Sequence, residues 1–335
     1  NYLIPDVSDE FNVRMDLSKY NYLKSGRNPW QDPYWYRTEV VLPKSYRGKK
    51  VWLILNGINY RADVWVNGRQ VADKKDIVGM FRRFKLDITG YAHAGANNCI
   101  AIKIYQVDHP GVPTPGTQLK VFGPVRGHSY DIFKDETLKI SGGWDCAPVV
   151  RDRNMGIYQK VIVEATDEVL IENPFVITTL PKSTTMPMKV DTGLAKVNIK
   201  LEVRNTSAKL VEGKVNAWIT LINEVKFPTY TKHMEGYLKP IKLTKKVALR
   251  AGERKVVELT PEDFPSLLIE NPYLWYPNGY GEQYLHHMKL SFSIGGKVSD
   301  TKEFDFGIRE VASGLNRVGD ECGRVYYVNG KRIFC

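Results

Sequence analysis

The sequence contains little that would mark a membrane protein, a metal protein or a disulfide-rich scaffold. No apolar run approaches the roughly 18 to 20 residues that a membrane helix needs, so no membrane partner is expected. Only four cysteines occur in 335 residues, and their spacing matches neither a zinc pattern nor a dense disulfide framework. We expect four free thiols, with one disulfide pair as the alternative.

The two ends of the chain also lack familiar signals. The chain opens with NYLIPDVSDEFNV, without an initiator methionine or a signal-peptide pattern. It stops at Cys335, just after a hairpin has begun its second strand. We therefore expect a mature or cut form of a longer protein. Its compartment is left open, with the periplasm or the extracellular space favoured for the parent.

The net positive charge of the chain comes from lysines scattered along the sequence. There are 48 Lys and Arg residues against 37 Asp and Glu residues, a formal charge of +11. The densest basic runs, at 47–50 and 243–250, are short and carry no interleaved stacking aromatics. A nucleic-acid partner, which would show steep salt-dependent affinity, is therefore not favoured.

Apolar residues alternate with polar ones almost throughout, which predicts an all-β protein. The run VNIKLEVRN (197–205) and the run HMKLSFSI (287–294) both show period two, so each strand would bury one face. Asn67-Gly68 and Gly295-Gly296 are strong hairpin signals. Helical signals are weak, and residues 261–271 could form one or two turns behind Pro261.

Many short strands with regular turns are typical of β-sandwiches, and a boundary is predicted near residue 166. Trp52 and Trp65 are expected in the core of the first sandwich. No metal site is predicted, because the adjacent His286 and His287 would point to opposite faces of a strand.

Three groups of motifs follow one another in the order of a known family. The first group consists of residues 34–43, 51–71 with its VWVNG hairpin, and 81–89. It resembles the N-terminal sugar-binding jelly roll of glycoside hydrolase family 2. NPYLWYPNGYGEQ (271–283) is similar to a segment of that family's immunoglobulin-like domain. FDFGIREV (304–311) and YYVNGKRIF (326–334) resemble the lead-in to its catalytic (β/α)8 barrel.

The resemblance implies a fold and an order of domains. Residues 1–166 would form a galactose-binding-like jelly-roll sandwich, 167–311 an immunoglobulin-like β-sandwich, and 312–335 a truncated lead-in, with the barrel absent. A glycosidase of this kind needs two carboxylates, which the family carries on the barrel. No substitute pair is persuasive in this sequence, so we assign no catalytic residue and no cofactor, and we expect the chain alone to be inactive.

The loop GGWDCAPVVRDRN (142–154) combines an aromatic ring with charged groups, as sugar recognition requires. Taken by themselves, Trp144 could instead cap the sandwich and Asp145 a turn. The resemblance favours binding of the terminal sugar by Trp144 and Asp145, as in the β-mannosidase and exo-β-glucosaminidase branch. Arg151, Asp152, Arg153 and Asn154 would support the loop, or one arginine would reach the substrate or the barrel.

The favoured hypothesis is the non-catalytic N-terminal part of a retaining β-glycosidase that acts on β-glucosaminides or β-mannosides. Its partners would be a β-linked carbohydrate and its own C-terminal barrel. Two alternatives stay open. One is a parent of the β-galactosidase or β-glucuronidase type, and the other is a free-standing carbohydrate-binding protein of two sandwiches.

Overall fold

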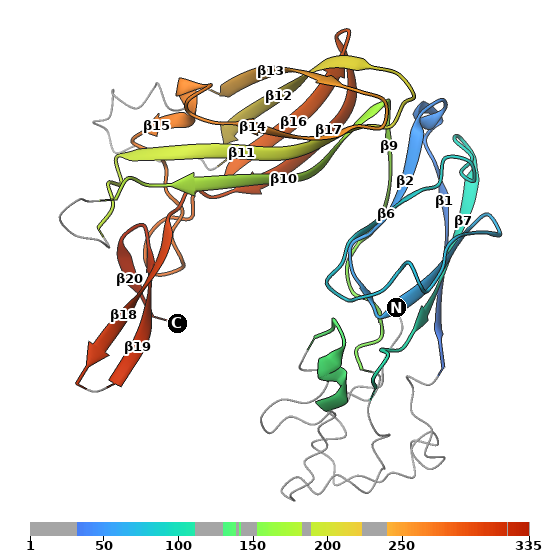
Figure 1. Ribbon diagram of the computed structural model, residues 1–335, viewed down its shortest axis with the longest axis horizontal. Helices are drawn as coiled ribbons and strands as arrows, with labels where there is room; N and C mark the ends of the chain where they lie inside the picture. Colours follow the sequence, from blue (N-terminus) through green and yellow to red (C-terminus); the bar gives the residue numbers. More distant parts are fainter. Residues whose placement is uncertain are drawn as a thin grey trace, which may run out of the picture. The chain divides into compact units, whose positions relative to one another are not determined.

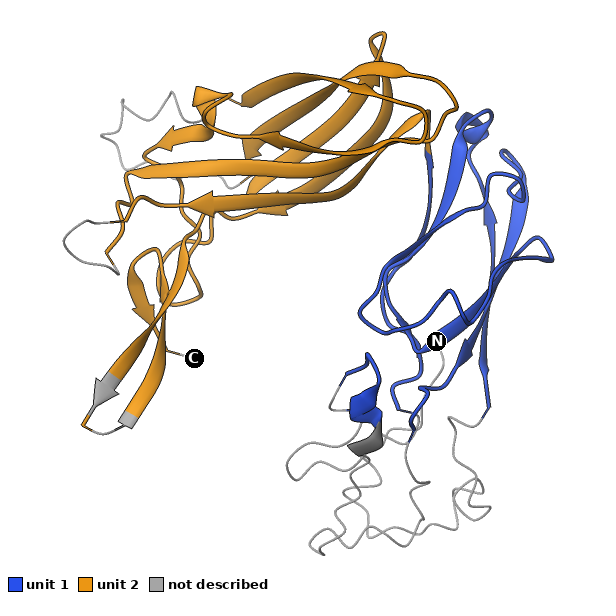
Figure 2. Cartoon of the chain, viewed as in Figure 1, with its two compact units in different colours: residues 1–165 blue, residues 166–335 orange. Residues whose placement is uncertain are grey.

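The computed structural model describes residues 32–110, 130–138, 141, 153–182, 189–222, 240–319 and 321–334. The chain divides into two compact units, residues 1–165 and 166–335 (Figure 2). The described residues form strands joined by turns and short 3-10 helices, which confirms the predicted all-β class. No helix among them is long and apolar enough to cross a membrane.

Unit 1 is a sandwich of two antiparallel sheets. One sheet has the order β1-β7-β4-β5 and the other β6-β2-β9; Figure 1 labels β1, β7, β2, β6 and β9. The short strands β3 and β8 pair with each other. The strands are β1 Tyr34–Val41, β2 Lys50–Leu55, β3 Ile58–Asn59, β4 Arg61–Val66, β5 Arg69–Ala72, β6 Phe84–Asp87, β7 Asn97–Tyr105, β8 Gly156–Ile157 and β9 Val161–Thr166. The 3-10 helices are η3 Lys44–Tyr46 and η4 Tyr130–Lys134.

The core of unit 1 lies between its two large sheets. Leu53, Val64 and Ile104 are completely buried there. In β4 and β7 every second side chain is turned inward, as alternation along a strand requires. The β4–β5 turn is formed by Asn67 and Gly68, both with positive φ, as the sequence predicts.

The expectation that Trp65 is a core residue is wrong. Ala62, Val64 and Val66 occupy the inward positions of β4, so alternation places Trp65 on the outward face of the sheet. Trp52 is buried, with 4% of its surface exposed, and the Lys85 ammonium lies over its ring.

Unit 2 is a second sandwich with a small sheet appended. Its sheets have the orders β10-β11-β14, with β15 also paired to β11, and β13-β12-β16-β17. The strands are β10 Val169–Thr179, β11 Leu194–Asn205, β12 Val211–Leu221, β13 Ile241–Leu249, β14 Arg254–Leu259, β15 Leu268–Glu270, β16 His286–Ile294 and β17 Lys297–Phe306. The appended sheet is β18 Val311–Val318, β19 Glu321–Val328 and β20 Lys331–Ile333.

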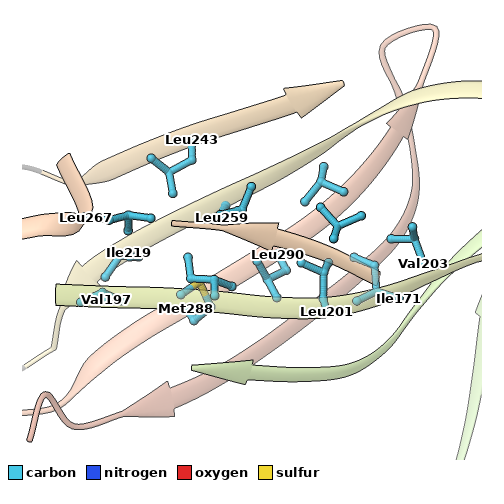
Figure 3. Close-up of a cluster of buried hydrophobic side chains, with 14 of the residues drawn as sticks. Ile171, Val197, Leu201, Val203, Ile219, Leu243, Leu259, Leu267, Met288 and Leu290 are labelled. Carbon is cyan, nitrogen blue, oxygen red and sulfur yellow. The ribbon is translucent and has the colours of Figure 1, made fainter. Parts of the chain in front are cut away.

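Side chains from both sheets of unit 2 meet in one apolar core, of which Figure 3 shows a part. Val197, Leu201 and Val203 point inward from β11, and Met288 and Leu290 face them from β16. These are the positions that the period-two pattern predicts to be buried.

The segment 261–271 differs from the helical expectation. It contains only the 3-10 helix η6, Pro265–Leu267, and then continues as β15. Leu267 and Ile269 are buried two residues apart, and β15 pairs with the start of β11. Tertiary pairing therefore outweighs the weak local signal for a helix.

Three of the sequence motifs meet around Trp275 in unit 2. The Trp275 amide donates a hydrogen bond to the carbonyl of Ile308, and its own carbonyl accepts one from Asn329 Nδ2, each over 2.9 Å. The Arg309 guanidinium lies 4.5 Å from the centre of the Trp275 ring. The hairpin that contains Asn329 is thus fixed to the sandwich at its turn.

Candidate functional site

The predicted sugar-binding loop lies largely outside the described residues. Trp144, Asp145, Arg151 and Asp152 all fall in the segment 142–152, of which the structure describes nothing. The residues that flank this segment, Ser141 on one side and 153–154 on the other, are described. The described part of the site consists of the residues next to this segment and their partners.

The two ends of the segment are joined to each other. The side-chain amide of Asn154 donates a hydrogen bond to the hydroxyl oxygen of Ser141 over 2.6 Å. Ser141 is completely buried, and its backbone amide donates to the carbonyl of Leu138 at 2.9 Å. Ser141 and Asn154, the described residues on either side of 142–152, are therefore in direct contact.

Asn59, on β3, fixes the backbone at Arg153 and Asn154, where the described chain resumes after residue 152. Its Nδ2 donates to the carbonyl oxygens of both Arg153 and Asn154, at 2.9 Å each. Its Oδ1 accepts from the hydroxyl of Thr137 over 2.9 Å. The side chain is completely buried and uses both amide hydrogens and its oxygen, so its desolvation is compensated.

The backbone at the returning end makes a sharp turn. Arg153 and Asn154 have φ values of 57° and 54°, in the left-handed region that non-glycine residues rarely adopt. Gly156 follows with φ 148°, and a Cβ there would lie 2.6 Å from the Tyr36 hydroxyl. The carbonyl contacts of Asn59 therefore stabilise a conformation that the local sequence would not choose alone.

The Arg153 side chain is enclosed in the protein. None of its surface is exposed, and its Nε donates to the carbonyl oxygen of Pro110 at 2.7 Å. It thus connects the returning end of the segment to the chain that leaves β7. Complete burial of a guanidinium requires hydrogen bonds of this kind.

The carboxylate of Asp135 fixes His109, in the segment that follows β7. Asp135 is buried, and its oxygens contact the backbone amide of His109 at 2.8 Å and the His109 Nδ1 atom at 2.7 Å. Tyr60, Val107 and Ile132 form a small apolar cluster in this region. Burial, and then the nearby Asp135 carboxylate, raise the pKa of the Tyr60 hydroxyl. Residues 106–110 and 130–138 are therefore held to the end of the sandwich by polar and apolar contacts together.

The contacts described so far are hydrogen bonds within the protein, and the described residues show no metal cluster. No group of three or more His, Cys, Asp or Glu side chains among them could hold a metal ion. His286 is buried and His287 is on the opposite, solvent face of β16, where it contacts Asp305 at 2.8 Å. Cys99 and Cys322 are free thiols, while Cys146 and Cys335 lie outside the described residues.

Three acidic residues in turns of the described chain, Asp73, Glu262 and Asp263, have ordinary surface roles. Asp73 Oδ1 accepts from the backbone amide of Lys75 in a turn, and Asp263 forms an ion pair of 2.7 Å with Lys245. A hydrogen bond from the Thr260 hydroxyl, ahead of other contacts, lowers the pKa of the exposed Glu262 carboxyl.

Sequence reasoning did not identify Asn59, Thr137 or Ser141. Asn59 is separated from Arg153 by 94 positions, so no local pattern links them. Ser141 is only 13 positions from Asn154, but no motif marks it as a hydrogen-bond partner. The one available signal is an asparagine directly beside apolar Ile58 in a strand, where an amide needs a buried partner.

Comparison with known proteins places the chain among carbohydrate-active enzymes. The family model "Glycosyl hydrolase 2 galactose-binding domain-like" matches residues 19–159, and the family model "Glycosyl hydrolases family 2" matches residues 171–309. The exo-β-D-glucosaminidase of Amycolatopsis orientalis is 32% identical over 90% of this chain and 23% of its own length. The mannosylglycoprotein endo-β-mannosidase of Lilium longiflorum is 27% identical over 100% of this chain and 31% of its own length.

Solved structures give the same result. The crystal structure of Amycolatopsis orientalis exo-chitosanase CsxA is 28% identical, with a TM-score of 0.61 over 93% of this chain and 31% of that protein. The chain thus spans only about a quarter to a third of the length of these relatives. Two domain models in the expected order, together with these relatives, show that the chain belongs to glycoside hydrolase family 2.

Proposed function

We propose that the chain is the non-catalytic N-terminal part of a retaining β-glycosidase acting on β-glucosaminides or β-mannosides. In this proposal the segment 142–152 reaches into the pocket for the terminal sugar. Relatives named exo-β-D-glucosaminidase and endo-β-mannosidase, each three to four times as long as the part that this chain matches, support a longer parent.

The observation that carries the proposal is the direct contact between the residues on either side of the segment 142–152. Ser141 and Asn154, which flank this segment, are hydrogen-bonded to each other. Asn59 donates two further hydrogen bonds to the backbone at Arg153 and Asn154, so the positions of the flanking residues are fixed. A binding site needs such support, because residues on loops are placed as precisely as the scaffold beneath them. In the proposal, the contacts between Ser141, Asn154 and Asn59 would provide that support for Trp144 and Asp145.

Each site residue has a separate role in this proposal. The Trp144 ring would pack against the C–H face of a pyranose, and the Asp145 carboxylate would accept hydrogen bonds from its hydroxyl groups. Arg153 and Asn154 would act as supports, since their contacts are to Pro110, Ser141 and Asn59. Arg151 and Asp152 would add ion pairs and backbone hydrogen bonds to the same loop.

The first experiment assays the 335-residue chain with aryl β-D-glucosaminides and aryl β-D-mannosides. The expected result is no turnover above the rate of a protein-free blank, because the paired carboxylates are assigned to a separate barrel. Measurable turnover by the purified chain would show that it carries its own catalytic pair.

The second experiment uses the chain joined to its catalytic domain and compares Asp145→Asn with Asp263→Asn. A hydrogen bond to a charged group is worth about 1.5 to 3 kcal/mol, so Asp145→Asn should lower kcat/KM by about 10- to 100-fold. Asp263 is a surface acid of unit 2, and its substitution should remove the same charge without a loss of rate. Equal kinetics for the two variants would contradict the role of Asp145.

A further inference from the structure

The outward face of the sheet β1-β7-β4-β5 carries two neighbouring tryptophans. Trp35 is 59% exposed, and its ring centre lies 5.2 Å from that of Trp65 at an angle of 31°. Ala101 lies opposite Trp65 on the adjacent strand β7, and its small side chain leaves space for the indole. An exposed tryptophan that rests on a second one is a preformed apolar platform, of the kind that marks binding surfaces.

Two lysines, Lys103 and Lys74, contact the aromatic rings of this face. Lys103 is directly opposite Trp35 in the register, and its Nζ lies 5.4 Å from the Trp35 ring centre and 5.1 Å from that of Tyr105. Lys74 Nζ lies 4.7 Å from the Tyr105 ring centre. Asp63 is directly opposite Lys103 on β4, and its carboxylate accepts hydrogen bonds from the Tyr105 hydroxyl and the Lys74 backbone amide. Within the described residues neither Lys103 nor Lys74 forms an ion pair with this or another carboxylate.

A cavity of about 390 Å³ adjoins the platform at the end of the sheet where β7 finishes. Its lining residues are Arg61, Lys74, Lys75, Tyr105, Gln106, Val107 and Asp108. The Arg61 guanidinium is bound to both carboxylate oxygens of Asp108, which is the single acidic residue of this lining. Lys74 and Lys75 give the lining itself an excess of positive charge, while the carboxylates of Asp63 and Asp73 accept hydrogen bonds from the backbone amides of these two lysines.

We propose that Trp35, Trp65, Lys103, Tyr105 and Lys74, here called the aromatic–lysine face, bind an acidic oligosaccharide together with the adjoining cavity. The Trp35 ring would pack against one pyranose, while Lys103 and the cavity lysines would bind uronate or sulfate groups on that ring and its neighbour. The cavity has a volume typical of a site for one small ligand. This surface goes beyond the proposed function, which rests on the segment 142–152.

The arrangement favours an acidic saccharide over two other ligands. A neutral saccharide would use the Trp35 platform and offer no anionic group to Lys103, Lys74 and Lys75. A single-stranded nucleic acid requires a charged groove that follows its backbone with several stacked bases. Here one well-exposed ring stands beside one cavity.

The test measures binding of the 335-residue chain to oligogalacturonate by calorimetry, with a neutral cello-oligosaccharide and oligothymidylate as comparisons. The expected result is that oligogalacturonate binds at least tenfold more tightly than either comparison, with an affinity that falls as salt is added. Trp35→Ala and Lys103→Glu should each weaken binding of oligogalacturonate at least tenfold. Lys75→Glu, an exposed change at the cavity, provides a further variant that should weaken binding even if Trp35→Ala fails to fold.

Trp218→Ala is the matched control. Trp218 is 43% exposed on unit 2, and Lys242 Nζ lies 4.3 Å from its ring centre, so it reproduces an exposed tryptophan with a lysine elsewhere. Its substitution should leave oligogalacturonate binding unchanged. Equal loss with Trp218→Ala, equal affinity for the cello-oligosaccharide, or equal affinity for oligothymidylate would each overturn the proposal.

Discussion

The side-chain amide of Asn59 donates hydrogen bonds to the carbonyl oxygens of Arg153 and Asn154, two residues that both have positive φ. One buried amide on β3 thus fixes the point at which the segment 142–152 returns to the sandwich. The contact links residues that lie far apart in the sequence.

Removal of the Asn59 side-chain amide should destabilise unit 1. In Asn59→Ala, the carbonyls of Arg153 and Asn154 and the hydroxyl of Thr137 lose a partner inside the protein. We expect the free energy of unfolding of unit 1 to fall by about 3 kcal/mol, since each unsatisfied buried group costs about 1 to 3 kcal/mol and partly relaxes. Asn56→Ala, which removes one exposed hydrogen bond to Lys160, should cost about 0.5 to 1 kcal/mol. Urea denaturation measures both variants, and equal costs would contradict the role of Asn59.

The core of unit 2 should be intolerant of a methyl group at Gly213. A Cβ there would lie 2.4 Å from Phe292 and 2.6 Å from the carbonyl oxygen of Ser293. We expect Gly213→Ala to lower stability by about 2 kcal/mol, within the range found for overpacked cores. Gly323→Ala is the control, because no atom lies within 4 Å of the position that its methyl group would take, and it should be neutral or slightly stabilising. Similar melting temperatures for the two variants would count against this packing.

Burial of His286 should make unit 2 sensitive to acid. Burial lowers the pKa of its imidazole to about 4 from the usual value of 6.5. Between those two values the unfolded chain binds a proton that the folded protein does not, so stability decreases as the pH falls through this window. The loss from pH 7 to pH 4 should approach about 3 kcal/mol. In His286→Leu this part of the pH dependence should disappear, as measured by denaturation at several pH values, and an unchanged slope would exclude His286 as its source.

The turn at Asn329 should depend on both its conformation and its hydrogen bonds. Asn329 has φ 51°, and its side chain joins the Trp275 carbonyl to the Glu310 amide at 2.9 Å and 2.8 Å. Asn329→Gly keeps the favourable left-handed backbone and loses the side-chain bonds, whereas Asn329→Ala also adds strain of about 1 kcal/mol. Thermal unfolding should therefore rank the wild type above Asn329→Gly and Asn329→Gly above Asn329→Ala. The reverse order of the two variants would show that backbone conformation is unimportant at this turn.

Much of the fold could be predicted because the alternation of apolar and polar residues that marks a strand is visible within a few residues of sequence. Alternation of apolar residues identified the buried faces of β11 and β16, and paired turn residues identified two hairpins. The order of the motifs identified the family, because each motif has its own place along the chain. The error at Trp65 arose from the assumption that a tryptophan is buried, although the alternation in β4 places it outward.

The sequence by itself determined the all-β class, the family and the residue types of the proposed sugar-binding loop, since these depend on periodicity and on short motifs. Only the tertiary structure decided that Asn59 and Ser141 hold the base of that loop, and that Trp35, Trp65 and Lys103 share one outward face. These relationships depend on strand register and on contacts between distant segments. Such contacts are settled by the packing of the whole sandwich, which no short stretch of sequence encodes.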